Sequence, residues 1–212
     1  GTSRETVQNS GVTLDDSNHM SFPDDAKVQF GAGNDLQIYH DASNSYINDA
    51  GTGNLKIAAS QIDLLGGTDG GETMATFVDN GAATLYHDNS AKIATSATGV
   101  SITGTLLATT DTDTSNTGSV TLDFAANQNF VLTLTGNVTL ANPSTEQVGQ
   151  AGVIVCIQDG TGSRTLSLGT DYETAGGAGI TLSTAGGAVD VIPYFVKASG
   201  SIQLGAVQLA FS

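Results

Sequence analysis

Short β-type segments separated by turn residues constrain the fold of this chain more than any other feature of its sequence. Segments of about 3–6 residues recur with turn signals about every 8–12 positions, and Gly, Asn and Asp interrupt them. No stretch keeps apolar residues at i, i+3, i+4 and i+7 over three turns, which an amphipathic helix requires. We therefore predict an all-β fold. The predicted strands before residue 110 are Val12–Leu14, Lys27–Phe30, Leu36–Tyr39, Leu55–Ile57, Ile62–Leu64, Met74–Val78, Ala83–Tyr86 and Val100–Ile102.

The chain divides near residues 109–117. Asp111 to Asn116 contains no large apolar residue, which is typical of a linker. Residues 1–115 carry 15 acids and 4 bases, and residues 116–212 carry 6 acids and 2 bases, so the first part holds −11 of the net charge of −15. We predict a repetitive β-structured shaft over 1–115 and an antiparallel β-sandwich head over 116–212.

The shaft contains a repeat. Ile38 to Ser43 matches Leu85 to Ser90 at an offset of 47, and a Thr-Gly pair follows each copy. Hydrophobic residues make up only 39% of the chain and Trp is absent, whereas about 45–50% apolar content is usual. Small repeated β units cannot bury an apolar face alone. We therefore expect a homotrimer, in which three chains share one axial core.

The predicted head has more regular strands. Phe130, Leu132 and Leu134 alternate with polar or smaller residues, and Val138 to Leu140 follows. A hairpin loop of Thr135, Gly136 and Asn137 would place both apolar sets on one face, with Asn137 near the left-handed region. Val153 to Ile157 is apolar on both faces, which indicates a central strand.

Turns and irregularities mark the rest of the predicted head. Asp159 to Gly162 predicts a turn that leads into a strand over Thr165 to Leu168. In the strand from Val189 to Val196, Pro193 indicates an edge or a bulge. The apolar phase of the last strand shifts near Gly205, which indicates a bulge or turn there.

The charge and the cysteine content exclude several classes of protein. A net charge of −15 repels phosphate backbones, so we expect no nucleic-acid partner. No apolar run approaches the ~18–20 residues of a membrane helix, so we expect no membrane insertion. The single Cys156 excludes an intrachain disulfide framework and, in its apolar strand, indicates a core residue. The first residue is Gly1 and no secretory signal pattern follows it, so we expect a piece of a longer chain or a processed one.

The residues from Phe30 to Asp41, continuing through Ser43 to Ile47, resemble a repeat of tail-fibre proteins of marine bacteriophages. Gly71 to Ala75 leading to Leu85–Asp88 resembles the next segment of those fibres. Leu132–Asn137, Asp159–Leu166 and Ala188–Ile192 are similar to their distal ends. The resemblance implies a homotrimer on the virion, with host recognition as its role and other virion proteins among its partners. It implies no receptor-binding residues.

Several patterns that carry chemistry elsewhere are incomplete here. His40–Asp41 and His87–Asp88 combine metal-ligand types, but a strand places His40 and Asp41 on opposite faces, so we predict a hydrogen-bonded His and no metal. Asp111 to Ser115 starts like a calcium loop, yet Asn116 stands at the Gly position and Leu122 at the Glu position. Gly31-Ala32-Gly33 lacks the third glycine of a dinucleotide loop, and no nucleophile elbow is present. We predict no cofactor.

Asp171, Tyr172 and Glu173 form the one acid–aromatic cluster of the predicted head. A glycosidase needs two carboxyl groups about 5–10 Å apart in a groove. A solvated loop beside a Gly-rich run explains these residues without a catalytic role, so we predict that the protein is not an enzyme. A polysaccharide depolymerase is the third alternative.

We therefore predict a virion fibre, on the tail or the head of the particle, that adheres to a host bacterial surface. Multivalent contacts from a rigid trimer would raise the avidity of weak saccharide sites. The alternative is a structural capsid-decorating fibre or tail spacer without receptor binding. The candidate receptor-binding residues are Asp159, Thr161, Arg164, Asp171 and Tyr172.

Overall fold

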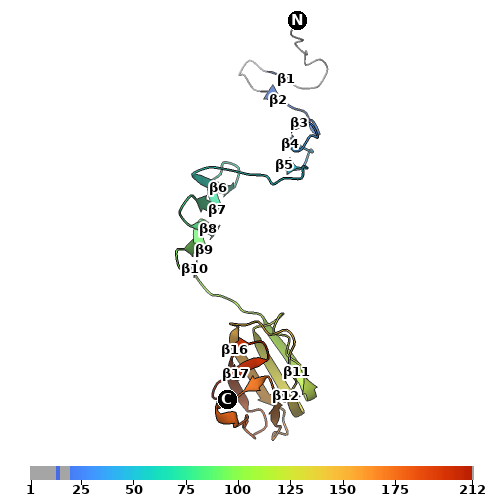
Figure 1. Cartoon of the computed structure of the whole chain (residues 1–212), viewed down its shortest axis with the longest axis vertical. Helices are drawn as coiled ribbons and strands as arrows, with labels where there is room; N and C mark the ends of the chain where they lie inside the picture. The colour runs from blue at the N-terminus through green and yellow to red at the C-terminus, as the bar shows by residue number, and fades with distance from the viewer. Residues whose placement is uncertain (1–12, 15–19, 212) are drawn as a thin grey trace. The chain divides into compact units, whose positions relative to one another are not determined.

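The computed structural model describes residues 13–14 and 20–211, and over these residues the predicted all-β class is confirmed (Figure 1). The described residues contain no α-helix and one short 3-10 helix, η1 (Ala175–Gly177). They include no helix with the length and apolar character needed to cross a membrane. Contacts divide the chain into a first unit that ends at Thr103 and a second unit that begins at Gly104.

The strands of the first unit pair in antiparallel order along the chain. They form a two-stranded, a three-stranded and a five-stranded sheet. The predicted strands are present except at Leu55–Ile57, which forms none, and at Val12, which lies outside the described residues. The strands are β1 (Thr13–Leu14), β2 (Met20–Ser21), β3 (Lys27–Phe30), β4 (Leu36–His40), β5 (Ser45–Asp49), β6 (Gln61–Gly66), β7 (Glu72–Val78), β8 (Ala83–His87), β9 (Ser90–Ser96) and β10 (Gly99–Ile102).

The two copies of the repeat form hairpins with different turns. In the first copy, the Asp41 carboxylate accepts hydrogen bonds from the backbone N–H of Ser43 at 3.0 Å and of Asn44 at 2.7 Å. In the second copy, Asp88 and Asn89 alone join β8 to β9, and both have positive φ, at 50° and 57°. A two-residue turn with two positive φ angles matches the twist of a hairpin. The repeat therefore sets the position of each hairpin, while its loop length varies.

Each large sheet of the first unit has one apolar face. In the three-stranded sheet, the register aligns Val28, Ile38 and Ile47 across all three strands. In the five-stranded sheet, one row joins Leu64, Ala75, Leu85, Ile93 and Ile102. These rows are open to solvent in a single copy, and Ile47, for example, is 62% exposed. Within the described part of the unit, only Ala75 and Thr84 are buried. A single copy of this unit therefore has almost no core.

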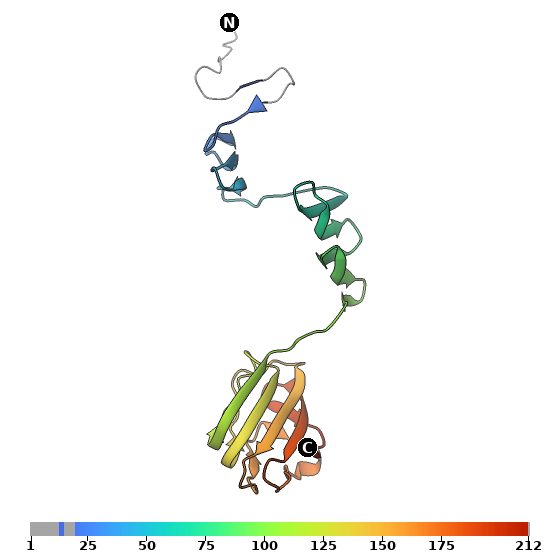
Figure 2. The same cartoon turned by 180° about the vertical axis from the view of Figure 1, so that it is seen from behind.

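The second unit is built on one mixed eight-stranded sheet, with the order β11-β12-β13-β16-β17-β15 and with β14 and β18 paired to β12 and β16 (Figure 2). The pairs β11–β12, β12–β13, β12–β14 and β15–β17 are parallel. Its strands are β11 (Thr110–Val120), β12 (Asn129–Leu140), β13 (Ala151–Gln158), β14 (Leu166–Leu168), β15 (Tyr172–Glu173), β16 (Val189–Ala198), β17 (Ser201–Leu204) and β18 (Gln208–Phe211).

The prediction of an antiparallel head is therefore wrong, because the hairpin at Thr135–Asn137 does not form. Strand β12 runs straight through Gly136 and Asn137. Its first half pairs with β13, and its second half, from Val138, pairs with β14. A Cβ atom on Gly136 would collide with the Thr117 side chain of β11, so close strand packing accounts for this glycine.

The predicted linker is also wrong, because Asp111 to Asn116 belongs to strand β11. The division between the units lies at Thr103/Gly104 rather than at 115/116. Alternating Thr residues favour a strand, and parallel pairing with β12 gives partners to backbone groups on one side of this edge strand. The side chain of Asn116, which is 2% exposed, donates to the carbonyl oxygens of Asp113 at 3.1 Å and Thr133 at 3.2 Å.

Strand β13 is central, between β12 and β16, as predicted. The prediction of an edge or a bulge at Pro193 is wrong, because β16 pairs with β13 on one side and with β17 and β18 on the other, and its register shifts lie elsewhere. Pro193 lies where the neighbour of β16 changes from β18 to β17, so the missing N–H breaks no continuous ladder. The chain leaves β17 at Leu204, and Gly205 donates its N–H to the Pro193 carbonyl at 2.8 Å. The hydrophobic core lies on one side of the sheet and consists of Leu122, Phe124, Phe130, Leu132, Leu134, Val138, Leu140, Ile154, Cys156, Leu166, Tyr172, Leu182, Ile192, Tyr194, Val196, Ile202 and Leu204.

Candidate functional site

The turn after β13 is fixed by the carboxylate of Asp159. Its Oδ1 accepts hydrogen bonds from the backbone N–H of Thr161 at 3.1 Å and of Gly162 at 2.9 Å. Gly162 has φ +75°, and a Cβ atom there would collide with the Thr184 carbonyl oxygen. We call residues 159–165 the Asp159 loop. Its shape is set by an Asx turn and by a position that only glycine fits.

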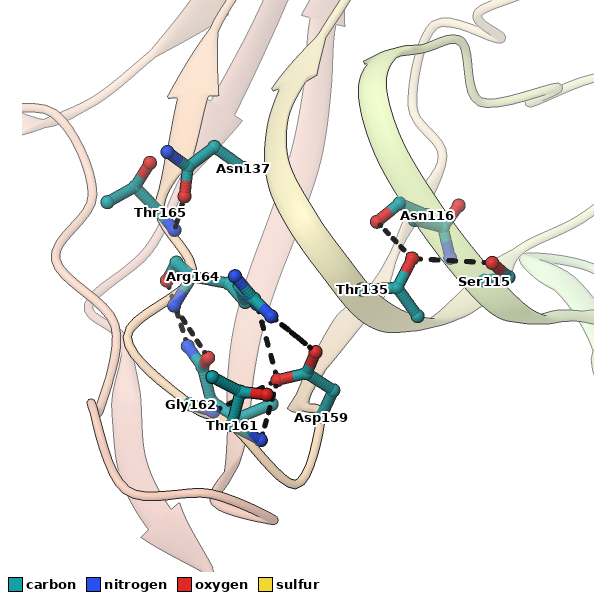
Figure 3. A network of polar contacts seen from close by, with 10 residues as sticks. Ser115, Asn116, Thr135, Asn137, Asp159, Thr161, Gly162, Arg164 and Thr165 are labelled. Carbon is teal, nitrogen blue, oxygen red and sulfur yellow. Dashed lines mark hydrogen bonds and ion pairs between the residues drawn. The ribbon is translucent and has the colours of Figure 1, made fainter.

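Arg164 closes the Asp159 loop with an ion pair (Figure 3). Its Nε lies 3.2 Å from both carboxylate oxygens of Asp159, and its Nη2 lies 2.7 Å from Oδ2. The hydrogen bonds from Arg164, more than its charge alone, hold the pKa of Asp159 below its usual value. The two side chains are 27% and 20% exposed, so both reach the surface. Arg164 therefore forms a salt bridge just before β14, which begins at Leu166.

Gln158 anchors the other side of this loop. Its amide accepts from the Arg164 backbone N–H at 2.8 Å and donates to the Arg164 carbonyl at 2.9 Å. Gln158 is 2% exposed. Sequence reasoning missed this residue, although it continues the buried alternation of Ile154 and Cys156 along β13.

Asp171 does not join the Asp159 loop. Its backbone N–H donates to Asn142 Oδ1 at 3.1 Å, and its carbonyl accepts from the Ile202 N–H at 2.7 Å. Strand β14 separates it along the chain from Arg164. The structure therefore brings together Asp159, Thr161 and Arg164, and it places Asp171 in a second surface loop.

Tyr172 is a core residue, contrary to its prediction as a receptor-binding residue. It is 6% exposed and lies beside Ile202 of β17. Burial raises the pKa of its hydroxyl group, which has no hydrogen-bond partner among the described residues. Stacking on a sugar requires an exposed ring, so Tyr172 does not supply that contact.

The pKa of Glu173 is shifted in the direction opposite to that required of a glycosidase general acid. It accepts hydrogen bonds from Ser201 Oγ at 2.7 Å and from Lys197 Nζ at 3.2 Å. The Ser201 bond first, and the Lys197 bond second, lower the pKa of Glu173. A general acid in a glycosidase needs a raised pKa. The geometry therefore gives no support to catalysis by Asp171 and Glu173.

Among the described candidate metal ligands, His40 and His87 lie at hairpin turns of the first unit, and Cys156 lies in β13. His40 is exposed and its Nδ1 lies 3.1 Å from Ser45 Oγ, so the predicted hydrogen bond exists. Among the described residues, no group of three or more His, Cys, Asp and Glu side chains could hold a metal ion. Cys156 is 1% exposed, as predicted for a core residue, and burial raises its pKa to about 12.

The Asp159 loop lies at one end of the sheet of the second unit, and β11 begins at the opposite end. Strands β11, β12 and β13 are mutually parallel, so their starts share one end of the sheet. At that end, the carbonyl oxygen of Thr109, the residue before β11, accepts hydrogen bonds from the backbone N–H groups of Gln128 and Asn129. The Asp159 loop follows the opposite end of β13 and is therefore turned away from the point where the chain reaches the sheet.

The second unit is thus a mixed β-sheet with a surface turn that an Asx turn and an ion pair hold in shape. Residues 112–200 match the family model described as "Putative phage tail fibre C-terminal domain". Searches of curated proteins and of solved structures found no match. The family match supports a phage tail fibre protein, and therefore a virion-associated structural protein. Tail fibre domains are generally structural rather than catalytic.

Proposed function

We propose that this protein is a homotrimeric bacteriophage fibre that attaches the virion to a saccharide on the surface of its host bacterium. The observation that carries the proposal is the match of residues 112–200, within the second unit, to a tail fibre C-terminal domain. A marine phage is the proposed source, because the repeat segments of the first unit resemble those of tail fibres of marine phages.

The apolar faces of the first unit support association of copies. Leu64, Leu85, Ile93 and Ile102 are 48%, 48%, 41% and 45% exposed in one row of the five-stranded sheet. Full burial of such a side chain contributes about 1.5–3 kcal/mol. Three copies around one axis would remove these faces from water together, and the opposite faces would remain in solvent.

Neighbouring residues of β10 test this association. Ile102 lies on the apolar face, whereas Ser101 lies on the other face, and both are exposed in the single copy. Ile102→Asp should shift the protein from trimer to monomer in sedimentation experiments, whereas Ser101→Asp should leave the trimer intact. A stable folded monomer of the unaltered chain would contradict the proposal.

The position of the Asp159 loop supports attachment by the second unit. Thr161 is exposed, and Arg164 Nη1 has no hydrogen bond within the described residues, so both can meet a ligand without breaking the ion pair. Asp171 offers a second polar contact from its own loop. Three such weak sites on one trimer, with several trimers per virion, can raise avidity by about 10²–10⁴.

A bulky substitution tests this surface without removing the ion pair. Thr161→Gln should weaken binding of the purified protein to host cells, while Ser119→Gln, on exposed strand β11, should not. The protein should also compete with phage adsorption. If the unaltered trimer neither binds host cells nor competes, the adhesive role fails.

A structural role without receptor binding is the second candidate. The pairing of Arg164 with Asp159 and the burial of Tyr172 favour it, because they leave few groups for a ligand. This candidate predicts the failure of the adhesion experiments with an intact trimer.

A further inference from the structure

The second unit has a second apolar surface, on the side of its sheet opposite the core. Along β13, Ile154 and Cys156 point into the core, so Val153, Val155 and Ile157 point to the other side. We call this side the outer face.

The register assembles the outer face from four strands. Val131 of β12 aligns with Val155 of β13, and Val155 aligns with Val191 of β16. In the next row, Ile157 aligns with Val189, which also pairs with Phe211 of β18. The Val and Ile side chains are half-buried, and the rows are therefore continuous apolar surface rather than isolated residues.

Phe195 extends this surface along β16. It aligns with Ala151 of β13 and is 45% exposed, and Phe211 at the other end is 49% exposed. The row of Val131, Val155 and Val191 and the row of Ile157, Val189 and Phe211 contain no ionisable residue, although the chain carries 21 acids and a net charge of −15. The Phe195 row continues through Gln203 to Glu173, which forms an ion pair with Lys197 at the rim of the outer face. An apolar centre with charged residues at its rim is typical of a protein interface.

We propose that the outer face is the contact surface between the second units of associated copies of this chain. This inference rests on the proposed association through the first unit. Each copy of such an acidic chain repels its neighbours, and contact between them is least unfavourable where both surfaces are free of charge. A face whose centre is uncharged therefore suits a second copy.

The connection between the units makes a second copy the available occupant. Residues 104–109 join Thr103 to β11, which begins at Thr110, and six residues span at most about 20 Å. Association of the first units would therefore hold the second units at high effective concentration, on the millimolar scale for short linkers.

Apolar surface also continues along this connection. Leu106 and Leu107 are 73% and 87% exposed. Two exposed leucines just before β11 are further apolar surface that a second copy of the chain can cover.

The labelling rate of a cysteine introduced at the outer face measures whether a second copy covers that face. Phe195→Cys in the full chain should react with a maleimide at least about tenfold more slowly than Ala178→Cys, which is exposed in the loop after η1. The native Cys156 is buried and serves as the background in both variants. Sedimentation of the same samples reports whether the copies are associated.

The outcomes separate this inference from the proposed function. Associated copies with equally fast labelling at both positions would overturn the inference and leave the association intact. A monomeric chain would overturn both. Fast labelling of associated copies that host polysaccharide then slows would also overturn it, because the outer face would be a ligand surface.

The unaltered chain provides a second measurement that needs no cysteine. Hydroxyl-radical modification of Phe195 should be several-fold lower in the associated chain than in Ile102→Asp, if that variant is monomeric. Equal modification in the two proteins would overturn the inference.

Discussion

Removal of the Asp190 side chain should destabilise the second unit more than loss of any other of its acids. Asp190 lies on β16 opposite Cys156 and is 1% exposed. Its Oδ2 accepts from the Ser183 N–H at 2.7 Å, and its Oδ1 accepts from Ser183 Oγ at 2.7 Å and from the Ala210 N–H at 2.9 Å. One buried carboxyl group therefore ties β16 to the preceding loop and to β18.

The magnitude follows from the donors that lose their acceptor. Each buried donor left without a partner costs about 1–3 kcal/mol, and water entering the space recovers part of this. Asp190→Ala should therefore lower the free energy of unfolding by about 3–4 kcal/mol. Ser183→Ala removes only the hydroxyl bond and should cost about 1 kcal/mol. For a unit of this size, the larger loss corresponds to a fall in Tm of about 10–20 °C.

Urea denaturation followed by near-ultraviolet circular dichroism measures both variants. Tyr172 and Tyr194 are buried in the second unit and give a signal that depends on its packing. Asp123→Ala, at an exposed carboxylate that bonds only the Ala125 N–H among the described groups, is the matched control. A loss below about 1 kcal/mol for Asp190→Ala would refute the reasoning, because it would mean that the three donors find equivalent partners.

Three further predictions concern the Asp159 loop and the core. Because the bond from Arg164 holds the pKa of Asp159 below its ordinary value of 3.8, this contact stabilises the fold above pH 3.8 and is lost as the pH falls through the lowered value. Asp159→Asn should accordingly flatten the acid limb of a plot of unfolding midpoint against pH, and an unchanged limb would contradict this role. Gly162→Ala should cost about 1–3 kcal/mol in thermal or urea unfolding, since it adds left-handed strain and a collision with the Thr184 carbonyl; Gly160→Ala, where a Cβ atom meets open space, should cost less. Cys156, with its pKa raised to about 12, should resist a thiol reagent at pH 8 in the folded protein and react after denaturation, and rapid reaction of the native protein would contradict the burial of its thiol in the core.

Much of the first unit could be predicted from local sequence. The runs at Lys27–Phe30 and Leu36–Tyr39 became strands because alternation and turn residues act over a few positions. The run at Leu55–Ile57 has the same local pattern but forms no strand, since the described residues give it no pairing partner. The poor core expected from composition is also present, with two apolar sheet faces exposed in the single copy.

The candidate site was predicted in part. Asp159, Thr161 and Arg164 share one loop, because the Asp-Gly-Thr-Gly string is a local turn signal. Tyr172 could not be placed from its own neighbours, since its burial depends on Ile202 in a strand formed much later in the chain. The role of Asp190 was missed for the same reason, because its partners come from a loop and from the last strand.

By itself, the sequence determined the all-β class, the turns and the uneven distribution of apolar residues between the two parts of the chain. These properties follow from side-chain alternation and turn chemistry, which are local. Only the tertiary structure decided that Asp111–Asn116 is a strand, that β12 continues through Gly136 and Asn137, and that the sheet of the second unit is mixed. Alternation shows which side chains share a face, but the direction and partner of a strand depend on hydrogen bonds and packing between residues far apart in the chain.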